Sequence, residues 1–321
     1  MKAAIVTPPA GIPQYGFFED PVAGENEQLI RVKAAAIHPV AKSVAAGRHY
    51  SAAEGAHPFI AGVDGVGTLA DGTRVYFGGM RKPYGTMAEL SIVSQGFSAP
   101  LPAGISDTTA AAIFNPAMSS WLALTHRAQL QPGETVLILG ATGVAGKLAV
   151  QVAKLLGAGK VIAAGRNQTA LDQLYALGAD ECISLEQSPE ALIKAFATQP
   201  YDVVIDYLWG APVTALITAI TGKSMTKEAP RTRLVQVGAM AGDPISLPSA
   251  ALRSSRLEIM GSGGGSVSME AIFASFPAIM EHAAAGRLTI EAIEMPLEEV
   301  SAAWTRETNG GRIVLVPGVS S

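Results

Sequence analysis

The sequence predicts an α/β protein with two domains, one a doubly wound parallel sheet and the other a compact domain of mostly antiparallel strands. Of its 321 residues, 49% are hydrophobic and 16% are charged, so the chain has enough apolar side chains for two cores. The first third alternates short apolar runs with turn residues, as antiparallel domains do. From residue 135, short apolar strands alternate with amphipathic helices, which is typical of a parallel sheet covered on both faces.

Apolar runs bounded by turn residues predict the strands of the antiparallel domain, at residues 3–6, 28–37, 65–69, 73–77 and 87–93. From Asp107 the pattern changes, because apolar residues recur at helical spacing after an aspartate or serine that can cap a helix. One or two helices are therefore expected between this point and the turn at Pro132 and Gly133.

The alternation that follows predicts the parallel sheet. Expected strands lie at 135–139, 160–164, 181–185, 202–207 and 233–238, and expected helices lie near 144–156, 171–178 and 189–197. An apolar strand at 256–264 comes late in this module, where we expect the edge of the sheet, and a last strand at 311–318 is expected to rejoin the antiparallel domain. The predicted domains are residues 1–115 with 286–321, and residues 116–285.

Charge and cysteine content exclude several classes of function. The formal charge is −4 at pH 7 and no basic run occurs, so a nucleic-acid partner is not expected. No stretch of 18 apolar residues and no leader-like start is found, so no membrane segment is expected. The single cysteine, Cys182, permits no internal disulfide, which fits a reducing compartment. These features predict a cytoplasmic protein that acts on a small molecule.

A glycine-rich turn predicts dinucleotide binding. A buried-type strand, TVLIL, leads directly into Gly140, Gly143 and Gly146, and a helix follows them. Such glycines allow a tight turn, close approach of a pyrophosphate to the backbone, and close packing of helix on strand. The start of the helix then offers unpaired N–H groups to the phosphates. Thr142 and Val144 lie in the same turn and are expected to contact the cofactor.

The end of the next strand predicts a preference for NADPH. NAD-binding proteins usually carry an acid there for the ribose diol, but this chain has Gly165 followed by Arg166. The glycine leaves room for a 2′-phosphate, the guanidinium can bind it, and Asn167 is expected to assist. The alternative is that Arg166 is a solvated arginine at a helix start.

Five segments resemble the medium-chain dehydrogenase/reductase superfamily, and within it the zinc-free quinone oxidoreductase-like branch. They are HPFIAGVDGVGTL, YGTMAELSIV, LQPGETVLILGATGVAGKLAVQVAKLLGA, YDVVIDYLWG and LEIMGSGGG. The resemblance covers nearly the whole chain. It implies a GroES-like catalytic domain, a Rossmann cofactor domain and an active site in the cleft between them. It also implies that the nicotinamide half of the cofactor lies near Ser119, Gly238, Gly261 and Ser262.

The chain departs from the zinc-dependent members of that superfamily. Those members bind zinc through a cysteine near position 38, a Gly-His-Glu motif near 62–64 and a later Cys or Asp. Here His38 takes the place of the cysteine, Val63 takes the place of the motif histidine, and no cysteine precedes Cys182. A catalytic zinc site needs three protein ligands and one open position, so no metal is expected. The alternative is that His38 and Asp64 are a fragment of a metal site.

The substrate-side segment, IHPVAKSVAAGRHY, also departs from the family pattern. His38 stands where the family usually has Asn, and it can bond a carbonyl oxygen or donate a proton near neutral pH. The alternative is a structural histidine before a turn-forming proline. Lys42, Tyr50 and Asn115 are weaker catalytic candidates.

These observations together predict an NADPH-dependent, zinc-independent reductase that transfers hydride to a quinone or an α,β-unsaturated carbonyl. Two alternatives are a zinc-type alcohol dehydrogenase and a non-catalytic NADPH-binding structural or regulatory protein. The resemblance further implies a homodimer, because in that family the strand corresponding to residues 256–264 pairs with its copy across a two-fold axis.

Overall fold

The structure is a computed structural model, and it describes residues 1–7, 11–49, 58–221 and 231–318. The chain divides into two compact units. The terminal unit contains residues 1–115 and 278–321, and the central unit contains residues 116–277. The division falls twice within a helix, in α2 (Asp107–Leu122) and in α8 (Met269–Ala284). The second boundary was predicted at residue 285, after α8, but the helix is continuous across the division, which therefore lies inside it.

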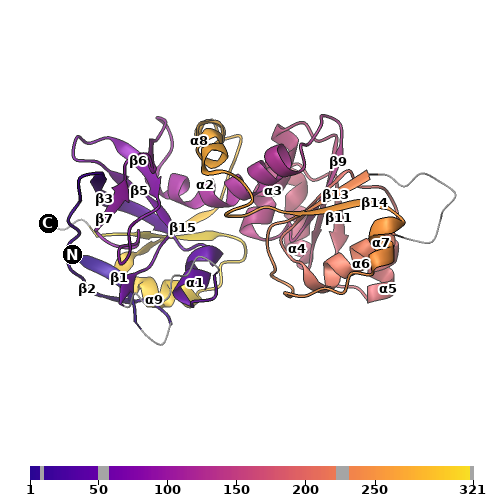
Figure 1. Ribbon diagram of the computed structural model, residues 1–321, viewed down its shortest axis with the longest axis horizontal. Helices are drawn as coiled ribbons and strands as arrows, with labels where there is room; N and C mark the ends of the chain where they lie inside the picture. Colours follow the sequence, from indigo (N-terminus) through magenta and orange to yellow (C-terminus); the bar gives the residue numbers. More distant parts are fainter. Residues whose placement is uncertain (8–10, 50–57, 222–230, 319–321) are drawn as a thin grey trace. The chain divides into compact units, whose positions relative to one another are not determined.

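The central unit is the predicted doubly wound sheet (Figure 1). All its strand pairs are parallel and their order is β11-β10-β9-β12-β13-β14. The chain starts at the centre of the sheet, builds outward to one edge, and then crosses to build the other half, so the order reverses between β9 and β12. The strands are β9 (Thr135–Leu139), β10 (Lys160–Gly165), β11 (Glu181–Ser184), β12 (Val203–Asp206), β13 (Arg231–Gln236) and β14 (Arg256–Gly261).

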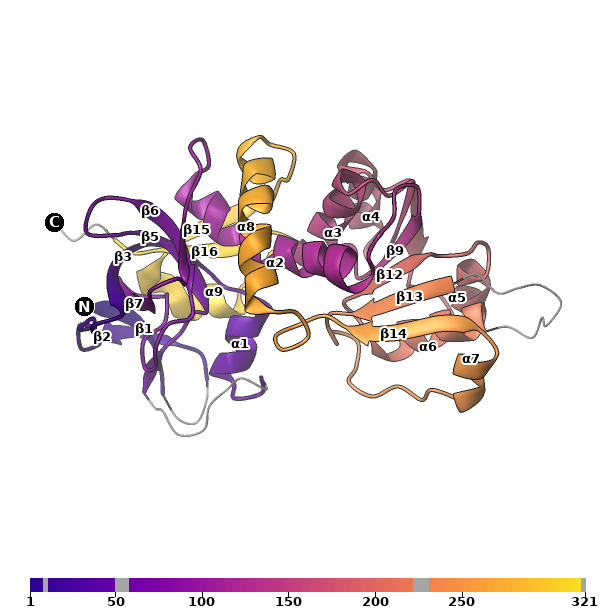
Figure 2. The same cartoon turned by 45° about the horizontal axis from the view of Figure 1, so that its top comes forward.

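Helices cover both faces of this sheet, as the nearly continuous apolar strands require (Figure 2). One face carries α3 (Val144–Leu155) and α4 (Gln168–Leu174), and the other carries α5 (Pro189–Phe196), α6 (Gly210–Ile220) and α7 (Ser249–Arg253). The second face forms one buried cluster that includes Leu137, Leu139, Phe196, Leu216 and Leu257.

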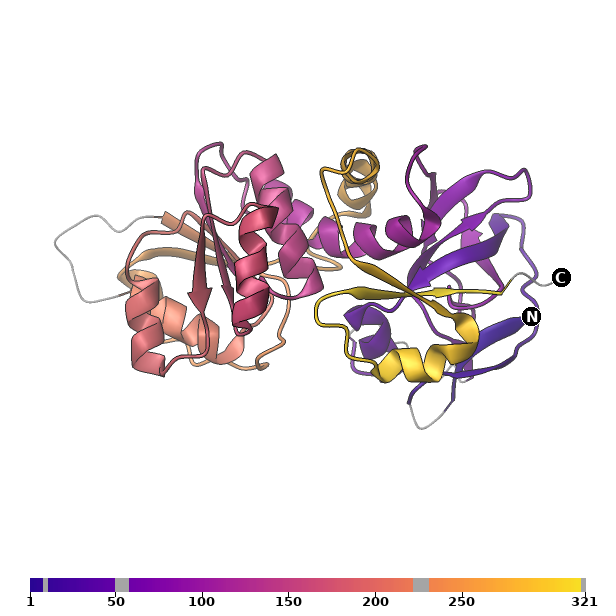
Figure 3. The same cartoon turned by 180° about the vertical axis from the view of Figure 1, so that it is seen from behind.

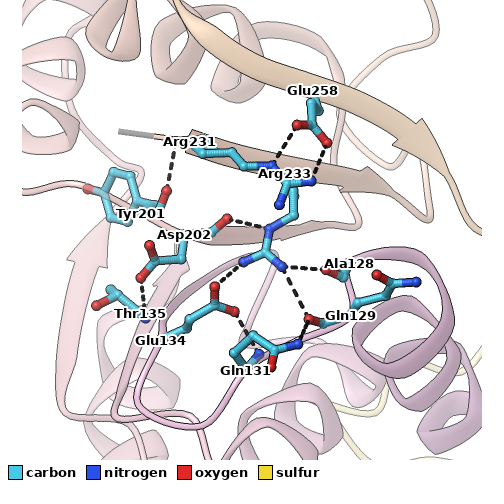
Figure 4. Close-up of polar contacts among 11 residues, drawn as sticks. Ala128, Gln129, Gln131, Glu134, Thr135, Tyr201, Asp202, Arg231, Arg233 and Glu258 are labelled. Carbon is cyan, nitrogen blue, oxygen red and sulfur yellow. Dashed lines mark hydrogen bonds and ion pairs between the residues drawn. The ribbon is translucent and has the colours of Figure 1, made fainter. Parts of the chain in front are cut away.

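Arg233 ties several segments together where the strands of this sheet begin (Figure 4). It lies on β13, and its guanidinium pairs with Glu134 and donates to the carbonyl oxygens of Ala128, Gln129 and Asp202. Its side chain is only 6% exposed. Two residues earlier on the same strand, Arg231 pairs with Glu258 of β14, but both of those side chains are exposed. The first network is thus buried and the second lies at the surface.

The terminal unit consists of two sheets and short helices. A three-stranded antiparallel sheet has the order β2-β1-β4, and a seven-stranded sheet has the order β15-β16-β3-β5-β6-β8, with β7 also paired to β3. The strands are β1 (Lys2–Val6), β2 (Gln14–Phe17), β3 (Glu27–Ala36), β4 (Phe59–Ile60), β5 (Asp64–Thr68), β6 (Arg74–Gly78), β7 (Leu90–Ser94), β8 (Ser98–Pro100), β15 (Ala292–Pro296) and β16 (Arg312–Val316).

The last strand of the chain completes this unit (Figure 3). β16 is antiparallel to β3, with Val314 opposite Ala36 and Leu315 opposite Ala35, and parallel to β15. The side chains of Ile313 and Leu315 are buried in the same cluster as Ala35. The prediction that the chain end rejoins the first domain is therefore confirmed.

Two helices of this unit were not predicted. They are α1 (Pro39–Ala45) and α9 (Val300–Thr305). The interpretation of Pro39 as a turn residue is wrong, because proline at the first helical position loses no helical hydrogen bond and has a helix-compatible φ. Within the described part of the chain, no helix is both long enough and apolar enough to cross a bilayer.

Candidate functional site

The glycine-rich turn after β9 has the geometry of a phosphate cradle. Gly140 has φ of +86°, a region that favours glycine, and its N–H and that of Ala141 both donate to the carbonyl oxygen of Ala164 at 2.9 Å. A Cβ on Gly146 would lie 2.2 Å from the carbonyl oxygen of Gly140, so only hydrogen fits there. The turn is thereby held tightly against the sheet and against the helix that follows.

The first turn of α3 is open to a ligand. Gly143 is the N-cap residue of α3 and is exposed, and no side chain caps the helix. Thr142 and Val144 on either side are half-buried. Uncapped N–H groups at a helix N-terminus attract anions. These residues therefore fit the pyrophosphate of a dinucleotide.

The end of β10 carries the residues expected near the adenosine ribose. A Cβ on Gly165 would lie 2.5 Å from Cγ2 of Thr142, so the threonine occupies the space that a larger side chain would need. Arg166 follows and is exposed. Asn167 uses its side-chain oxygen to accept from the N–H of Ala170 at 2.9 Å, which caps α4. Because that oxygen caps the helix, a ligand would be bound by the N–H groups of the Asn167 side-chain amide.

Ser119 is hydrogen-bonded to a tyrosine that the sequence analysis did not single out. Its Oγ donates to the carbonyl oxygen of Pro116 at 2.7 Å and lies 3.0 Å from the hydroxyl of Tyr207, which therefore donates to Ser119. Tyr207 directly follows β12 and lies between Gly140 and Gly238, since a Cβ on either glycine would come within 3.3 Å of it. Burial raises the pKa of Tyr207 to about 12, so the phenol stays protonated.

The ends of β13 and β14 hold the remaining predicted residues of the nicotinamide side. The N–H of Ser262 donates to the carbonyl oxygen of Gln236 at 2.8 Å, and Arg127 donates through Nε to that of Gly261 at 2.7 Å. A cavity of about 380 Å³ lies at this edge, lined by Trp209, Gln236, Ala239, Asp243, Ile259, Met260 and Gly261. The carboxyl edge of a doubly wound sheet is where its ligands bind.

His38 forms part of a buried polar cluster in the terminal unit. It is the N-cap residue of α1, and its Nε2 lies 3.1 Å from Oδ1 of Asp64 at the start of β5. The two side chains are 1% and 8% exposed. Asn115 donates from Nδ2 to Oδ2 of Asp64 at 2.7 Å. Burial raises the pKa of Tyr76 well above its usual value, and its charged, hydrogen-bonded neighbour Asp64 raises it further.

Two cations extend this cluster. Arg312, on β16, donates from one terminal nitrogen to the carbonyl oxygen of Ile37 at 2.8 Å. Burial lowers the pKa of Arg312 to about 10, an effect that Asp64 partly offsets, so the guanidinium is still charged at neutral pH. Lys42, on α1, is half-buried, and burial followed by repulsion from Arg312 lowers its pKa. Its ammonium lies 5.9 Å from the centre of the Trp304 ring.

The structure thus brings together His38, Asp64 and Asn115, which are far apart in the sequence. Tyr50, the third predicted catalytic residue, lies outside the described residues. Among those described, no three His, Cys, Asp or Glu side chains form a group that could hold a metal ion. Arg312 and Tyr207 were missed. The only local signal for either was that Tyr207 follows a buried strand next to the phosphate turn.

Comparisons with known proteins show similarity to dehydrogenases and quinone reductases. A family profile described as zinc-binding dehydrogenase matches residues 144–285, a stretch that contains neither His38 nor Asp64. The protein named "Probable NADPH-dependent quinone reductase tdiC" of Emericella nidulans is 28% identical, over 99% of this chain and all of that protein. "Putative quinone oxidoreductase YhfP" of Bacillus subtilis is also 28% identical, over 51% of this chain and 54% of its own length.

Solved structures extend the likeness to the whole fold. The quinone oxidoreductase of Thermus thermophilus, determined alone and with NADPH, is 28% identical with a TM-score of 0.79, and the match covers 98% of this chain and 100% of that one. The structure of AibC has a TM-score of 0.82 at 22% identity and covers 99% of this chain. The central unit is accordingly an NAD(P)H-binding Rossmann domain, and the terminal unit is its GroES-like companion. The chain belongs to the medium-chain dehydrogenase/reductase superfamily, in the quinone reductase-like branch, and is an oxidoreductase.

Proposed function

We propose that the protein is an NADPH-dependent reductase, independent of zinc, whose acceptors are quinones or α,β-unsaturated carbonyls. The observation that carries this proposal is the phosphate turn with Gly165 and Arg166 beside it. A carboxylate at position 165 would repel a 2′-phosphate, whereas the exposed guanidinium of Arg166 attracts it. The NADPH-dependent relatives described above support the same choice of cofactor.

Residues of the central unit would hold the cofactor. Gly140, Thr142, Gly143, Val144 and Gly146 would bind its pyrophosphate, as the narrow turn and the uncapped start of α3 allow. Gly165, Arg166 and Asn167 would bind the phosphorylated ribose. Bound NADPH supplies a hydride. The residues assigned to its nicotinamide half are Ser119, Gly238, Gly261 and Ser262, and the Tyr207 hydroxyl fixes the orientation of the Ser119 side chain.

The terminal unit would supply the contacts to the acceptor. A quinone or enone accepts hydride readily, so the protein mainly has to orient the acceptor and exclude water. We assign His38 as the donor to the acceptor oxygen, with Lys42 nearby on the same helix and Tyr50 as the third catalytic candidate. Zinc independence is part of the proposal, because Val63 occupies the position of the metal-binding histidine.

A matched panel of acceptors tests this function. NADPH oxidation is followed with quinones, enals and simple aldehydes, and each assay is repeated with NADH. Turnover of quinones or enals with NADPH, and little with saturated aldehydes, is expected. Tight NADPH binding without turnover of any acceptor would favour a non-catalytic role, and turnover of simple alcohols only after zinc is added would favour an alcohol dehydrogenase.

We further propose a cytoplasmic homodimer. Among the described residues, β14 is the last strand of the six-stranded sheet and pairs only with β13, on its inner side. An exposed sheet edge is normally covered or paired, and two copies of β14 would make one continuous sheet across a two-fold axis. A cytoplasmic location is consistent with Cys182, which is a free thiol.

A further inference from the structure

The buried cluster in the terminal unit contains more positive than negative charge. Asp64 is its one carboxylate within the described residues, and Asn115, His38 and Tyr76 already surround it. The guanidinium of Arg312 is also buried, at 8% exposure, but forms no ion pair with a described carboxylate. Buried charges are normally paired, since an unpaired charge loses its hydration without compensation.

Several buried polar atoms in this cluster also lack hydrogen-bond partners. Both ring nitrogens of His38, Nε of Arg312 and Oδ1 of Asp64 are inaccessible to solvent and have no hydrogen-bond partner of acceptable geometry among the described residues. Nε2 of His38 faces Oδ1 of Asp64 at 3.1 Å, whereas Nδ1 of His38 and Nε of Arg312 face no described carboxylate. His38 is 1% exposed. Buried polar groups in folded proteins are almost always satisfied, and exceptions often mark a catalytic role or an absent ion. Unused donors beside an excess of positive charge indicate a site for an anionic oxygen.

We propose that Arg312 and His38, with Lys42 beside them, bind the carbonyl oxygen of the acceptor and stabilise the negative charge that forms on it. This inference rests on the proposed reductase function and adds Arg312, from the last strand, to its catalytic residues. Lys42 is half-buried and is therefore more accessible than the two buried groups. Asp64 is a positioning residue, because Asn115 fixes its Oδ2 and its Oδ1 faces the imidazole.

The chemistry of the reaction requires such a site. When a hydride from NADPH adds to the β-carbon of an enone, the π electrons shift on to the carbonyl oxygen and leave an enolate with one negative charge. A proton from water then converts the enolate to the saturated carbonyl, so one hydride and one proton are consumed. Fixed donors and charges in a dry site stabilise that oxyanion in the transition state. Arg312 and His38 would stabilise the negative oxygen, as the catalytic metal does in zinc-dependent members of the superfamily.

Binding of 4-nitrophenol tests the site without any turnover. The compound is buffered below its own pKa, so that most of it is neutral in solution, and the absorbance of its phenolate is measured as protein is added. We expect the protein to bind the phenolate form and increase its fraction. Removing a hydrogen bond to a charged oxygen weakens binding by roughly 10- to 150-fold, so Arg312→Gln and His38→Gln should each show a loss of that size. Arg48→Gln, which removes an exposed charge near α1, should show none.

Two controls keep the test decisive. Arg312→Lys retains the charge and should keep part of the affinity, and urea unfolding followed by circular dichroism, which both units contribute to, reports whether each variant is folded. 4-Nitroanisole has the same ring but no ionisable oxygen. Equal binding of nitroanisole and nitrophenol, unchanged phenolate binding in Arg312→Gln, or no phenolate binding by the wild type would each overturn the inference. Phenolate binding without NADPH oxidation would instead retain this site and refute the reductase.

Discussion

The phosphate turn depends on two glycines at which a Cβ atom would clash with a neighbouring atom. Gly146 is predicted from the glycine-rich turn between a buried strand and a helix, and Gly165 from its place at the end of the next strand, and the structure gives a separate steric reason for each. A methyl group on Gly146 would meet the backbone oxygen of Gly140 at 2.2 Å, whereas one on Gly165 would meet the side chain of Thr142 at 2.5 Å. The first neighbour is backbone and cannot move aside, but the second can rotate. Gly146 is therefore the stricter requirement.

Cofactor choice is expected to depend on Arg166. Replacing it with alanine should weaken NADPH binding by roughly 10- to 150-fold, because a hydrogen bond to a charged group contributes about 1.5 to 3 kcal/mol. NADH has no 2′-phosphate, so its binding should change little. Nicotinamide fluorescence titrations of both cofactors measure this. Equal losses for the two cofactors, or a wild type that prefers NADH, would contradict the assignment.

Asp206 is a buried carboxyl group that accepts hydrogen bonds from the N–H groups of Leu208 and Trp209. Burial raises its pKa from 3.8 to about 6 despite those bonds. The folded state therefore binds a proton more tightly than the unfolded state. This group stabilises the fold below about pH 4, and its contribution falls as the pH rises to about 6.

Asp206→Asn should remove that pH dependence. Urea unfolding from pH 4 to 7 should show that the wild type loses up to about 3 kcal/mol relative to the variant, since each tenfold change in proton affinity is about 1.4 kcal/mol. The exposed Asp172→Asn provides a control with the same chemical change. Parallel stability curves for wild type and Asp206→Asn would show that the carboxylate is ionised throughout.

At the scale of elements, β13 offers two arginines that form ion pairs in different surroundings (Figure 4). Arg233 and its partner Glu134 are 6% and 22% exposed, whereas Arg231 and its partner Glu258 are 52% and 44% exposed. Buried pairs are costly to break, because the remaining partner keeps its charge without compensation, while water replaces an exposed partner. Neighbouring positions on one strand should therefore respond very differently.

Arg233→Met should lower the free energy of unfolding by roughly 3 to 5 kcal/mol, because it removes the ion pair of Glu134 and the guanidinium hydrogen bonds to three carbonyl oxygens. Arg231→Met should cost less than about 1 kcal/mol. Urea unfolding of the two variants at one pH gives the comparison directly. Similar costs for both would mean that the Arg233 network is as well hydrated as the surface pair.

The sequence predicted some of the elements and site residues and missed others. The strands of the central unit and its helices α3, α4 and α5 follow from local periodicity, whereas α6 and α7 were not predicted. The glycines of the phosphate turn follow from their spacing after a buried strand. His38 was singled out, but the alternative interpretation of it placed a turn at Pro39, which begins a helix. Arg312 was missed because nothing local marks it. It is the first residue of an apolar strand, and its contact with Ile37 spans 275 residues, so only the folded topology reveals its place.

We expect the reductase activity of the whole protein to survive exhaustive chelation of metal ions. Val63 replaces the metal-binding histidine, so on this proposal hydride transfer depends on Arg312, His38 and the bound cofactor. NADPH oxidation with a quinone is compared before and after dialysis against a chelator. Loss of activity that zinc alone restores would refute zinc independence.

The proposed homodimer predicts the mass of the protein in solution. Light scattering at micromolar concentration should give twice the chain mass of 33.0 kDa. A proline at position 258 of β14, in place of Glu258, removes an N–H that would pair across the two-fold axis or with β13, and should favour the monomer. Glu258→Gln keeps the N–H and should remain dimeric. A wild type of single-chain mass would contradict the pairing of β14.

β16 follows the whole central unit along the chain, and this order has a consequence for synthesis. The central unit is one continuous stretch, so it can fold while the rest of the chain is still being translated. Synthesis of the terminal unit starts first but is completed last, because β16, one of the strands that pair with β3, is made only after the central unit. A chain that terminates early would thus contain a complete cofactor domain next to an unfinished partner with an open strand edge. It would also lack Arg312, so it could capture the nucleotide but not the acceptor.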